Sequence, residues 1–213
     1  MRHFTKHSEP TDFSDWKLRY PAAKYADLRK DRLFPGAALA KRTLRASLLS
    51  EQKGLCCYCE SKIVSGNFHV EHFKPKGDGL FPELQLEYSN LHACCGAEAT
   101  GGEDEHCGHK KGDVFSSKLV SPLEADCASH FKYDVMGGIK GVDENGTETI
   151  KILNLDSALL KSSRKNLIEV FEDMEEEDFE TELRLHLDPA ANPLGEYYSM
   201  IEYLSANNLL LHK

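Results

Sequence analysis

The sequence predicts an α+β protein in which a small core, rich in cysteine and histidine, lies between an N-terminal and a C-terminal helical segment. Two stretches near the ends, within 22–53 and 156–206, have helical composition and leucines at helical spacing. The stretch between them has short alternating pieces, turns and six of the seven cysteines. Helices that flank a group of short strands are typical of the α+β class. We therefore expect three parts, which span 1–53, 54–118 and 119–213.

The N-terminal part is predicted to form two helices, over 22–34 and 37–53, because Pro35 and Gly36 interrupt the helical composition between them. In the second helix, leucines line one side and basic residues line the other. These basic residues are Lys41, Arg42 and Arg45. Two interpretations remain open: a solvated helix face, or a patch that contacts the backbone of a nucleic acid.

Short strands and turns are predicted in the middle of the chain. Residues 67–73 alternate and then meet a loop rich in proline and glycine, so they predict a strand. Residues 88–95 predict the opening of a helix or a loop. Residues 96–106 carry small and acidic side chains and predict an exposed loop, and 107–118 predict a short helix or turn.

The C-terminal part is predicted to be mainly helical. A glycine-rich stretch, 135–153, predicts a hairpin, and leucines at helical spacing predict a helix over 156–186. Two prolines end this helix, and 195–206 predict a last one. The acidic run within the long helix, 172–178, is either a solvated face or a docking surface for a basic partner.

Charge is distributed unevenly along the chain, whose formal net charge is −9. Residues 1–50 carry eleven basic and five acidic side chains, a net charge of +6, whereas 51–118 and 119–213 carry −4 and −11. Binding of phosphates needs local lysine and arginine, which displace counterions. We therefore expect any contact with nucleic acid to be local, in the basic N-terminal part or through a partner.

Membrane insertion and export are not expected. The sequence has no run of about eighteen apolar residues, and its start lacks the apolar core of a signal peptide. We therefore expect a cytoplasmic protein. Thiols stay reduced in the cytoplasm, so seven cysteines, an odd number, predict metal binding rather than a disulfide framework.

The spacing of the cysteines predicts a structural zinc site. Cys56 and Cys59 form a CxxC turn, which brings two sulfurs within reach of one tetrahedral ion. Cys107 and one member of the pair Cys94 and Cys95 would complete four thiolates. We favour Cys94 as the fourth ligand, with Cys95 as the alternative. A second interpretation is that the adjacent pair are only small buried residues.

Between the cysteines lie residues suited to hydrolysis. His69 and Glu71 alternate onto one face of the predicted strand, and His72 follows them. A carboxylate can hold a hard divalent cation, and a neutral imidazole can take a proton from water. Asn90 could then orient the base or its loop, and His109 could supply a second metal ligand. His69 is either a hydrogen-bonding core residue or part of the site. Four lysines beside these residues are either surface side chains or phosphate contacts: Lys74, Lys76, Lys110 and Lys111.

The order CxxC, VEHFKPK, YSNL and CGHKKGD resembles that of HNH endonucleases, the His-Me finger or ββα-metal class. The opening MRHFTK, the EHFKPK wording and the segment TIKILNLDSALLKSSRKNL are similar to the PtuB nucleases of Septu anti-phage systems. PtuB nucleases are encoded beside an ATPase, PtuA, and related nucleases are effectors of some retrons. The resemblance covers nearly the whole chain and is most specific over 56–113.

The resemblance implies a zinc-stabilised ββα-metal HNH core within 54–118 and a role for each motif residue. His72 would be the general base, Glu71 the first ligand of a catalytic Mg²⁺ or Mn²⁺, and Asn90 the residue that orients the base loop. His109 would be the second metal ligand. The last motif departs from the commoner pattern, because Gly108 stands where asparagine or histidine is usual. The interrupted second cysteine pair also lets His106 compete for zinc.

These inferences predict a metal-dependent endonuclease that hydrolyses phosphodiester bonds as the effector of an anti-phage system. The partners implied are an ATPase of the PtuA type and a nucleic acid substrate, and the resemblance admits a retron reverse transcriptase with its RNA–DNA product. An alternative is a non-catalytic zinc-binding adaptor that bridges the ATPase and nucleic acid. A CxxC thiol oxidoreductase fits poorly, because the extra cysteines and the lack of a βαβ pattern oppose it.

Overall fold

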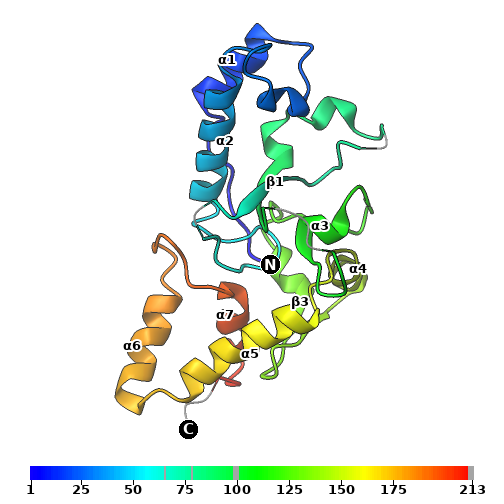
Figure 1. Cartoon of the computed structure of the whole chain (residues 1–213). Coiled ribbons are helices and arrows are strands. Elements are labelled where there is room, and N and C mark those ends of the chain that lie inside the picture. Colours follow the sequence, from blue (N-terminus) through cyan, green and yellow to red (C-terminus); the bar gives the residue numbers. More distant parts are fainter. Residues whose placement is uncertain (65, 78, 98–100, 211–213) are drawn as a thin grey trace.

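The computed structural model describes residues 1–64, 66–77, 79–97 and 101–210. Helices from the N-terminal part lie at one end of the molecule and helices from the C-terminal part at the other, with short strands between them (Figure 1). The mixture of helices and two small sheets confirms the α+β class. No helix of the described residues is both long and apolar enough to span a membrane.

The N-terminal part contains α1 (Thr11–Arg19), the short 3₁₀ helix η1 (Tyr25–Arg29) and α2 (Ala37–Glu51). The expected helix at 37–53 is confirmed, and Leu44 and Leu48 lie on its buried side. The helix expected at 22–34 is wrong. The backbone N–H of Lys24 donates to the carboxylate of Asp27, at 2.8 Å, and closes a single 3₁₀ turn instead.

An antiparallel pair of strands lies at the centre of the molecule (Figure 1). Strand β1 (Phe68–His72) pairs with β2 (Leu91–Cys95), and the short helix α3 (Cys107–Lys111) packs against β2. The strand at 67–73 and the short helix after 107 are thus confirmed, whereas the helix or loop expected at 88–95 is mostly a strand. Both faces of β2 are buried, so its sequence lacks the alternation that marks a half-exposed strand.

Two short 3₁₀ helices, η2 (Pro82–Leu84) and η3 (Tyr88–Asn90), lie in the connection between β1 and β2. The connection turns back toward β1 before β2 begins, because the backbone N–H of Phe73 donates to the carbonyl of Asn90 at 3.0 Å. Residues that follow β1 and residues that precede β2 are therefore held side by side.

Over its described residues, the C-terminal part contains a small hairpin, a short 3₁₀ helix and four α-helices. These elements are η4 (Cys127–His130), β3 (Phe131–Tyr133), β4 (Ile139–Gly141), α4 (Glu144–Leu153), α5 (Ala158–Glu172), α6 (Glu176–His186) and α7 (Tyr198–Ala206). The hairpin expected at 135–153 lies earlier, over 131–141, and 144–153 form α4, which Asp143 caps by accepting the N–H of Gly146 at 2.8 Å. The single helix expected over 156–186 is two helices, separated where Met174 packs against the core.

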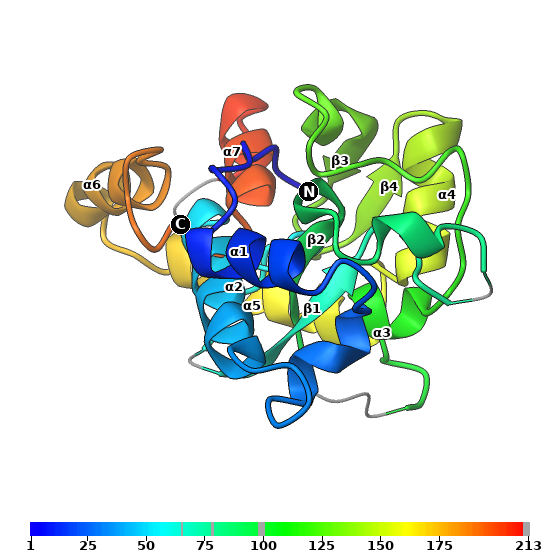
Figure 2. The same ribbon diagram turned by 90° about the horizontal axis from the view of Figure 1, so that it is seen from above.

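One apolar cluster joins all three parts of the chain. It contains Trp16 and Leu44 from the N-terminal helices, Leu91 from β2, and Ile168 and Leu204 from the C-terminal helices. The stretch that carries β1, β2 and α3 is therefore packed between the two helical ends, and the boundaries at 53 and 118 stay predictions. Helix α6 lies at the edge of the molecule, on the side away from α4 (Figure 2).

Candidate active site

Glu71 is a buried carboxylate whose two oxygens face different partners. Oε1 lies 2.8 Å from Nζ of Lys111 and accepts a hydrogen bond from the Tyr58 hydroxyl at 3.3 Å. Oε2 lies 3.5 Å from Nε2 of His69, which shares its face of β1. Burial alone would raise the pKa of Glu71, but His69 and the charge of Lys111 outweigh burial and lower it. The group is therefore an ionised carboxylate at neutral pH.

Neither interpretation of Lys111 from the sequence, a surface side chain or a phosphate contact, is correct. Its side chain is only 1% exposed and pairs with Glu71. Its ammonium also donates to the carbonyl of His72 at 3.0 Å. Lys111 thus ties α3 to the end of β1, and the sequence shows no sign of this, because two adjacent lysines usually lie at the surface.

His72 is buried as a neutral imidazole. Its Nε2 lies 3.0 Å from the carbonyl oxygen of Gln85, and because a carbonyl only accepts, Nε2 carries the proton. Nδ1 is buried and has no hydrogen-bond partner within the described part of the chain. Burial, with a smaller contribution from the charge of Lys76, lowers the pKa of His72 to about 4. The edge of Tyr25 covers the ring, with centroids 4.6 Å apart.

Asn90 uses its whole amide to hold the loop after β1. Its Oδ1 accepts the backbone N–H of Lys74 at 2.8 Å, and its Nδ2 donates to the carbonyls of Lys74 and Leu84 at 2.9 and 3.1 Å. The residue after Leu84 is Gln85, whose carbonyl anchors His72. Asn90 therefore lies where a residue that orients the base loop would lie, without touching the imidazole through a hydrogen bond of the described atoms.

His109 lies at the rim of the same region. Its ring stacks on that of His69, with centroids 4.1 Å apart, and its Nε2 lies 3.2 Å from the carbonyl oxygen of Gly96. Among the described residues, no hydrogen bond or ion pair joins His109 to Glu71. Within α3, Lys111 holds Oε1 of Glu71 and Gly108 faces Oε2.

These groups open onto a cleft of about 640 Å³ between η1, α2, β1 and α3. Glu71, His69 and His109 line one part of it, and four basic side chains line another. The four are Arg29, Lys41, Arg45 and Lys76. None of them forms an ion pair within the described residues. Burial and the charges of Arg29 and Arg45 lower the pKa of Lys41. The cleft is therefore suited to an anion.

His72 does not line this cleft, whereas Tyr25, which covers it, does. The cleft thus brings together Glu71 and His109 of the predicted site and places His72 directly behind its wall. Arg29 and Tyr25 come from a region in which the sequence indicated only a helix. Their contribution depends on the packing of η1 against α2, which no local pattern reveals.

Five cysteines and one histidine gather where the CxxC turn, the end of β2 and the start of α3 meet. They are Cys56, Cys59, Cys94, Cys95, Cys107 and His106. All the cysteines are free thiols. The sulfur of Cys56 lies 3.8 Å from that of Cys94 and 3.9 Å from that of Cys107, and the sulfurs of Cys59 and Cys95 are 3.8 Å apart. Zn–S bonds of about 2.3 Å in a tetrahedron place sulfurs about 3.8 Å apart, so these residues fit zinc.

The ligand atoms form two overlapping groups. The first is Cys56, Cys94, Cys95 and Cys107, and the second is Cys59, Cys95, His106 and Cys107. Cys95 therefore shares a group with every other cysteine of the cluster. Cys94, in turn, accepts the backbone N–H of Gly108 at 3.2 Å, a bond that favours a thiolate. The choice between Cys94 and Cys95 thus stays open.

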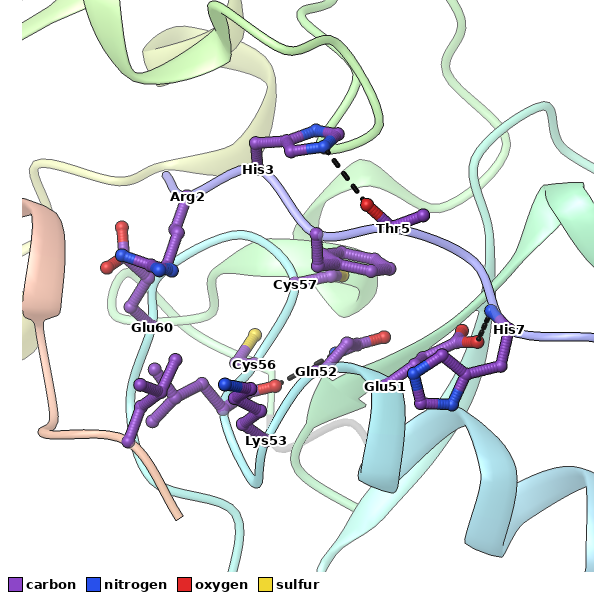
Figure 3. A pocket seen from close by; sticks show the side chains of 13 residues that line it. Arg2, His3, Thr5, His7, Glu51, Gln52, Lys53, Cys56, Cys57 and Glu60 are labelled. Carbon is purple, nitrogen blue, oxygen red and sulfur yellow. Dashed lines mark hydrogen bonds between the residues drawn. The ribbon is translucent and has the colours of Figure 1, made fainter. Parts of the chain in front are cut away.

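A second pocket, of about 330 Å³, lies between the stretch before α1 and the loop after α2 (Figure 3). Arg2, His3 and His7 line one side, and Glu51 and Cys56 line the other. The backbone N–H of His7 donates to Glu51 at 3.1 Å. No lining residue is shared with the cleft at Glu71. None of the predicted hydrolytic residues, His69, Glu71, His72, Asn90 and His109, lines this second pocket.

Comparison with known proteins gives relatives of one kind. The chain is 35% identical over 137 residues to a protein of Vibrio cholerae serotype O1 biovar El Tor named as the HNH endonuclease of retron Vc95; the match covers 61% of this chain and 65% of that protein. It is 24% identical over 208 residues to the Escherichia coli protein named as the HNH endonuclease of retron Ec83, covering 79% of each chain.

A third relative is the Septu protein PtuB of Bacillus thuringiensis, with 29% identity over 120 residues, which cover 54% of this chain and 42% of PtuB. No family model matches the sequence. The matched region thus spans less than two thirds of the Vibrio and Bacillus proteins. The chain is a homologue of the proteins named as retron HNH endonucleases and of Septu PtuB.

Proposed function

We propose that this protein is a metal-dependent HNH endonuclease that hydrolyses phosphodiester bonds in nucleic acid. One observation carries the proposal: a neutral imidazole with an unpartnered nitrogen, His72, directly follows an ionised carboxylate that lines a basic cleft. A base and a carboxylate in this arrangement suit the attack of water on a phosphodiester. The names of the two retron relatives support the same chemistry.

His72 would act as the general base. Its Nε2–H is anchored on the carbonyl of Gln85, so the proton from water goes to Nδ1. The water oxygen bonds to phosphorus, the phosphorus–oxygen bond to the 3′ side breaks, and the departing oxygen takes a proton from solvent. Because Tyr25 covers the imidazole, the ring of Tyr25 must move aside when substrate enters.

Glu71 would hold the catalytic cation. The donor set fits Mg²⁺ or Mn²⁺, because Oε2 of an ionised carboxylate faces the cleft while Lys111 and Tyr58 hold Oε1. When bound, a divalent cation neutralises charge that develops on the phosphate and the departing oxygen. His109, on the rim of the cleft, is the second ligand that the family pattern predicts.

The basic wall would bind the phosphates that flank the scissile bond. Arg29 and Lys41 line the cleft from η1 and α2, and Arg45 of α2 reaches across to β1, where its guanidinium donates to the carbonyl of Phe68 at 3.0 Å. All three lack carboxylate partners among the described residues. This position favours the nucleic-acid interpretation of the basic face of α2 over a merely solvated one. It also accounts for how a chain with net charge −9 approaches phosphate, since the local charge, rather than the total, decides.

The cysteine cluster would hold one structural zinc ion. Cys56, Cys59 and Cys107 supply three sulfurs, and Cys94 or Cys95 supplies the fourth. A closed set of four sulfurs leaves no open position for substrate, so the ion fastens the CxxC turn, β2 and α3 together. Replacing Cys94 and Cys95 singly by serine separates the two candidates, because only the ligand's variant loses about one zinc per chain.

In the cell the nuclease would work in anti-phage defence with an ATPase of the PtuA type. The relationship to Septu PtuB supports this partner, and the retron relatives support a reverse transcriptase with its RNA–DNA product as a further one. Helix α6, whose first residues are acidic and exposed, lies away from β1 and α3, two of the elements that line the cleft (Figure 2). A basic surface of a partner could dock there without blocking substrate.

The test is cleavage of plasmid DNA and of RNA by the purified zinc-loaded protein, with and without the ATPase. We expect nicking that requires Mn²⁺ or Mg²⁺ and stops on addition of EDTA at a concentration that leaves zinc bound. His72→Ala, prepared in the same way, controls for contaminating nucleases. Absence of metal-dependent cleavage with the ATPase present would contradict the proposal and favour a zinc-binding adaptor.

A further inference from the structure

The helix α3 has no side chain at the position that faces the free oxygen of Glu71. A Cβ added to Gly108 would lie 2.5 Å from Oε2 of Glu71 and 2.5 Å from Nε2 of His69. Both distances are far below van der Waals contact, so no residue larger than glycine fits there without displacing one of the two groups. The space beside Oε2 that a ligand from α3 would need is already filled, by His69.

We infer that His69, from β1, is the second ligand of the divalent cation at Glu71, and that His109 positions it. This inference rests on the proposed function, because it concerns the same cation. The separation of 3.5 Å between Nε2 of His69 and Oε2 of Glu71 supports it. Two ligand atoms bound at about 2.1 Å to one cation lie about 3.0 to 3.4 Å apart, depending on the angle between them.

The hydrogen bond on the far side of His69 prepares the ring for this role. Nδ1 lies 2.7 Å from the carbonyl oxygen of Gly96, and because a carbonyl only accepts, Nδ1 carries the proton. Nε2, the atom that faces Glu71, is then the nitrogen left to bind a cation, and it does so by losing the proton that it shares with the carboxylate when no cation is bound. Histidine ligands of metals commonly donate their other N–H to a backbone carbonyl in this way, which fixes the tautomer and the orientation of the ring.

His109 contributes from the side. Its ring lies over that of His69 at a centroid distance of 4.1 Å, with 35° between the ring planes, and its Nε2 shares the carbonyl of Gly96. It therefore restricts the ring of His69 instead of reaching Oε2 itself. His109 is therefore a positioning residue. Removing its side chain leaves His69 in place as a ligand but leaves the ring of His69 less restricted.

A ligand pair of one carboxylate oxygen and one imidazole nitrogen also selects among cations. Mg²⁺ prefers oxygen ligands and gains little from imidazole, whereas Mn²⁺ accepts nitrogen as well as oxygen. The site is therefore a mixed nitrogen–oxygen site that binds Mn²⁺ more tightly than Mg²⁺, and His69 is the origin of the difference.

The experiment measures Mn²⁺ binding by the loss of the EPR signal of free Mn²⁺, on zinc-loaded protein without nucleic acid. His69→Ala is expected to weaken Mn²⁺ binding at least about tenfold and Mg²⁺ binding, measured by competition, much less. His109→Ala is expected to weaken Mn²⁺ binding by less than His69→Ala does. His130→Ala is the matched control, because His130 lies with Glu124 and Asp126 in an exposed group that could also bind a cation.

Three results would overturn the inference: unchanged Mn²⁺ binding in His69→Ala, a larger loss in His109→Ala than in His69→Ala, or loss of binding in His130→Ala. The first would mean that His69 and Glu71 form only a hydrogen bond. Failure of the proposed nuclease is a separate result, since it would appear as tight, His69-dependent Mn²⁺ binding without cleavage of any nucleic acid.

Discussion

Charged side chains are buried and paired around the β1–β2 sheet and α3, whereas they are exposed at the start of α6. Around the sheet, Glu71 and Lys111 are 6% and 1% exposed, and each is paired. On α6, residues 175–178 are all acidic and all exposed. Burial of a charge is costly unless it is paired, so the first arrangement persists only with specific partners. Exposed charge has no such cost, and its role must come from what binds it.

The comparison predicts that the free energy of unfolding depends far more on zinc in the central region than on the charged side chains of α6. Cys107→Ser, which removes a member of both sulfur groups, should lose zinc and lower the free energy of unfolding by several kcal/mol. Cys127→Ser is the control, because Cys127 is buried outside the cluster. It should keep zinc and cost about 1 to 2 kcal/mol. Elemental analysis and urea unfolding give both quantities, and full zinc content in Cys107→Ser would contradict the site.

A buried ion pair joins the N-terminus to the central region, and a hydrogen bond from the same ammonium reaches the C-terminal part. The ammonium of Met1 lies 2.7 Å from Glu60 and 3.0 Å from the hydroxyl of Tyr133 on β3. Burial alone would lower the pKa of the ammonium, but Glu60 and Tyr133 outweigh burial and raise it from 8.0 to about 11.

A group whose pKa is raised on folding contributes its full stabilisation below the pKa of the unfolded state. The stabilisation from Met1, up to about 4 kcal/mol, should therefore be present below pH 8 and be lost as the pH rises toward 11. Urea unfolding across this range measures the loss. Glu60→Gln should show a shallower decline, and equal slopes in the two proteins would rule the pair out as the cause.

The hydrogen bonds from Asn90 to the loop after β1 should stabilise the fold less than zinc does, but they should matter for activity. Asn90→Ala removes three hydrogen bonds to the loop and should lower the free energy of unfolding by about 2 kcal/mol. Displacement of the base by about 1 Å should slow cleavage about 100-fold. Asn207→Ala, at an exposed site after α7, should change neither. Cleavage by Asn90→Ala at the wild-type rate would show that the loop does not need the hydrogen bonds of Asn90.

The smallest effect on stability is expected at the start of α6. Reversing Glu175, Glu176 and Glu177 to lysine should lower the free energy of unfolding by only about 1 kcal/mol, because it replaces acidic side chains at the N-terminus of α6, and should leave the zinc content unaltered. If these residues dock the ATPase, the amount that co-purifies should fall and the complex should respond differently to salt. Undiminished co-purification would leave the acidic run as a solvated face.

The sequence predicts the order of the chemical groups better than their environment. Glu71, His72 and Asn90 could be singled out because their residue types carry the chemistry. The burial of Lys111 could not, since a lysine pair looks the same whether it meets solvent or a carboxylate. The consequence of Gly108 needs the register of β1 against α3, because the side chains that fill its space come from elsewhere in the chain.

Errors in the elements have similar causes. Strand β2 escaped detection because both of its faces are buried, and α1 because a nine-residue helix with few apolar residues has a weak pattern. The number and spacing of the cysteines predicted a metal, but the choice between the neighbours Cys94 and Cys95 depends on how β2 is oriented at its last residue.

The central claim, that the buried imidazole beside Glu71 performs the chemistry, is tested most directly by the single-turnover cleavage rate of His72→Ala at saturating Mn²⁺. Removal of a general base should slow the rate at least about 100-fold, while zinc content and Mn²⁺ binding remain close to those of the wild type and the variant stays folded. A rate within about threefold of the wild type, in a folded variant that binds Mn²⁺ normally, would contradict the account.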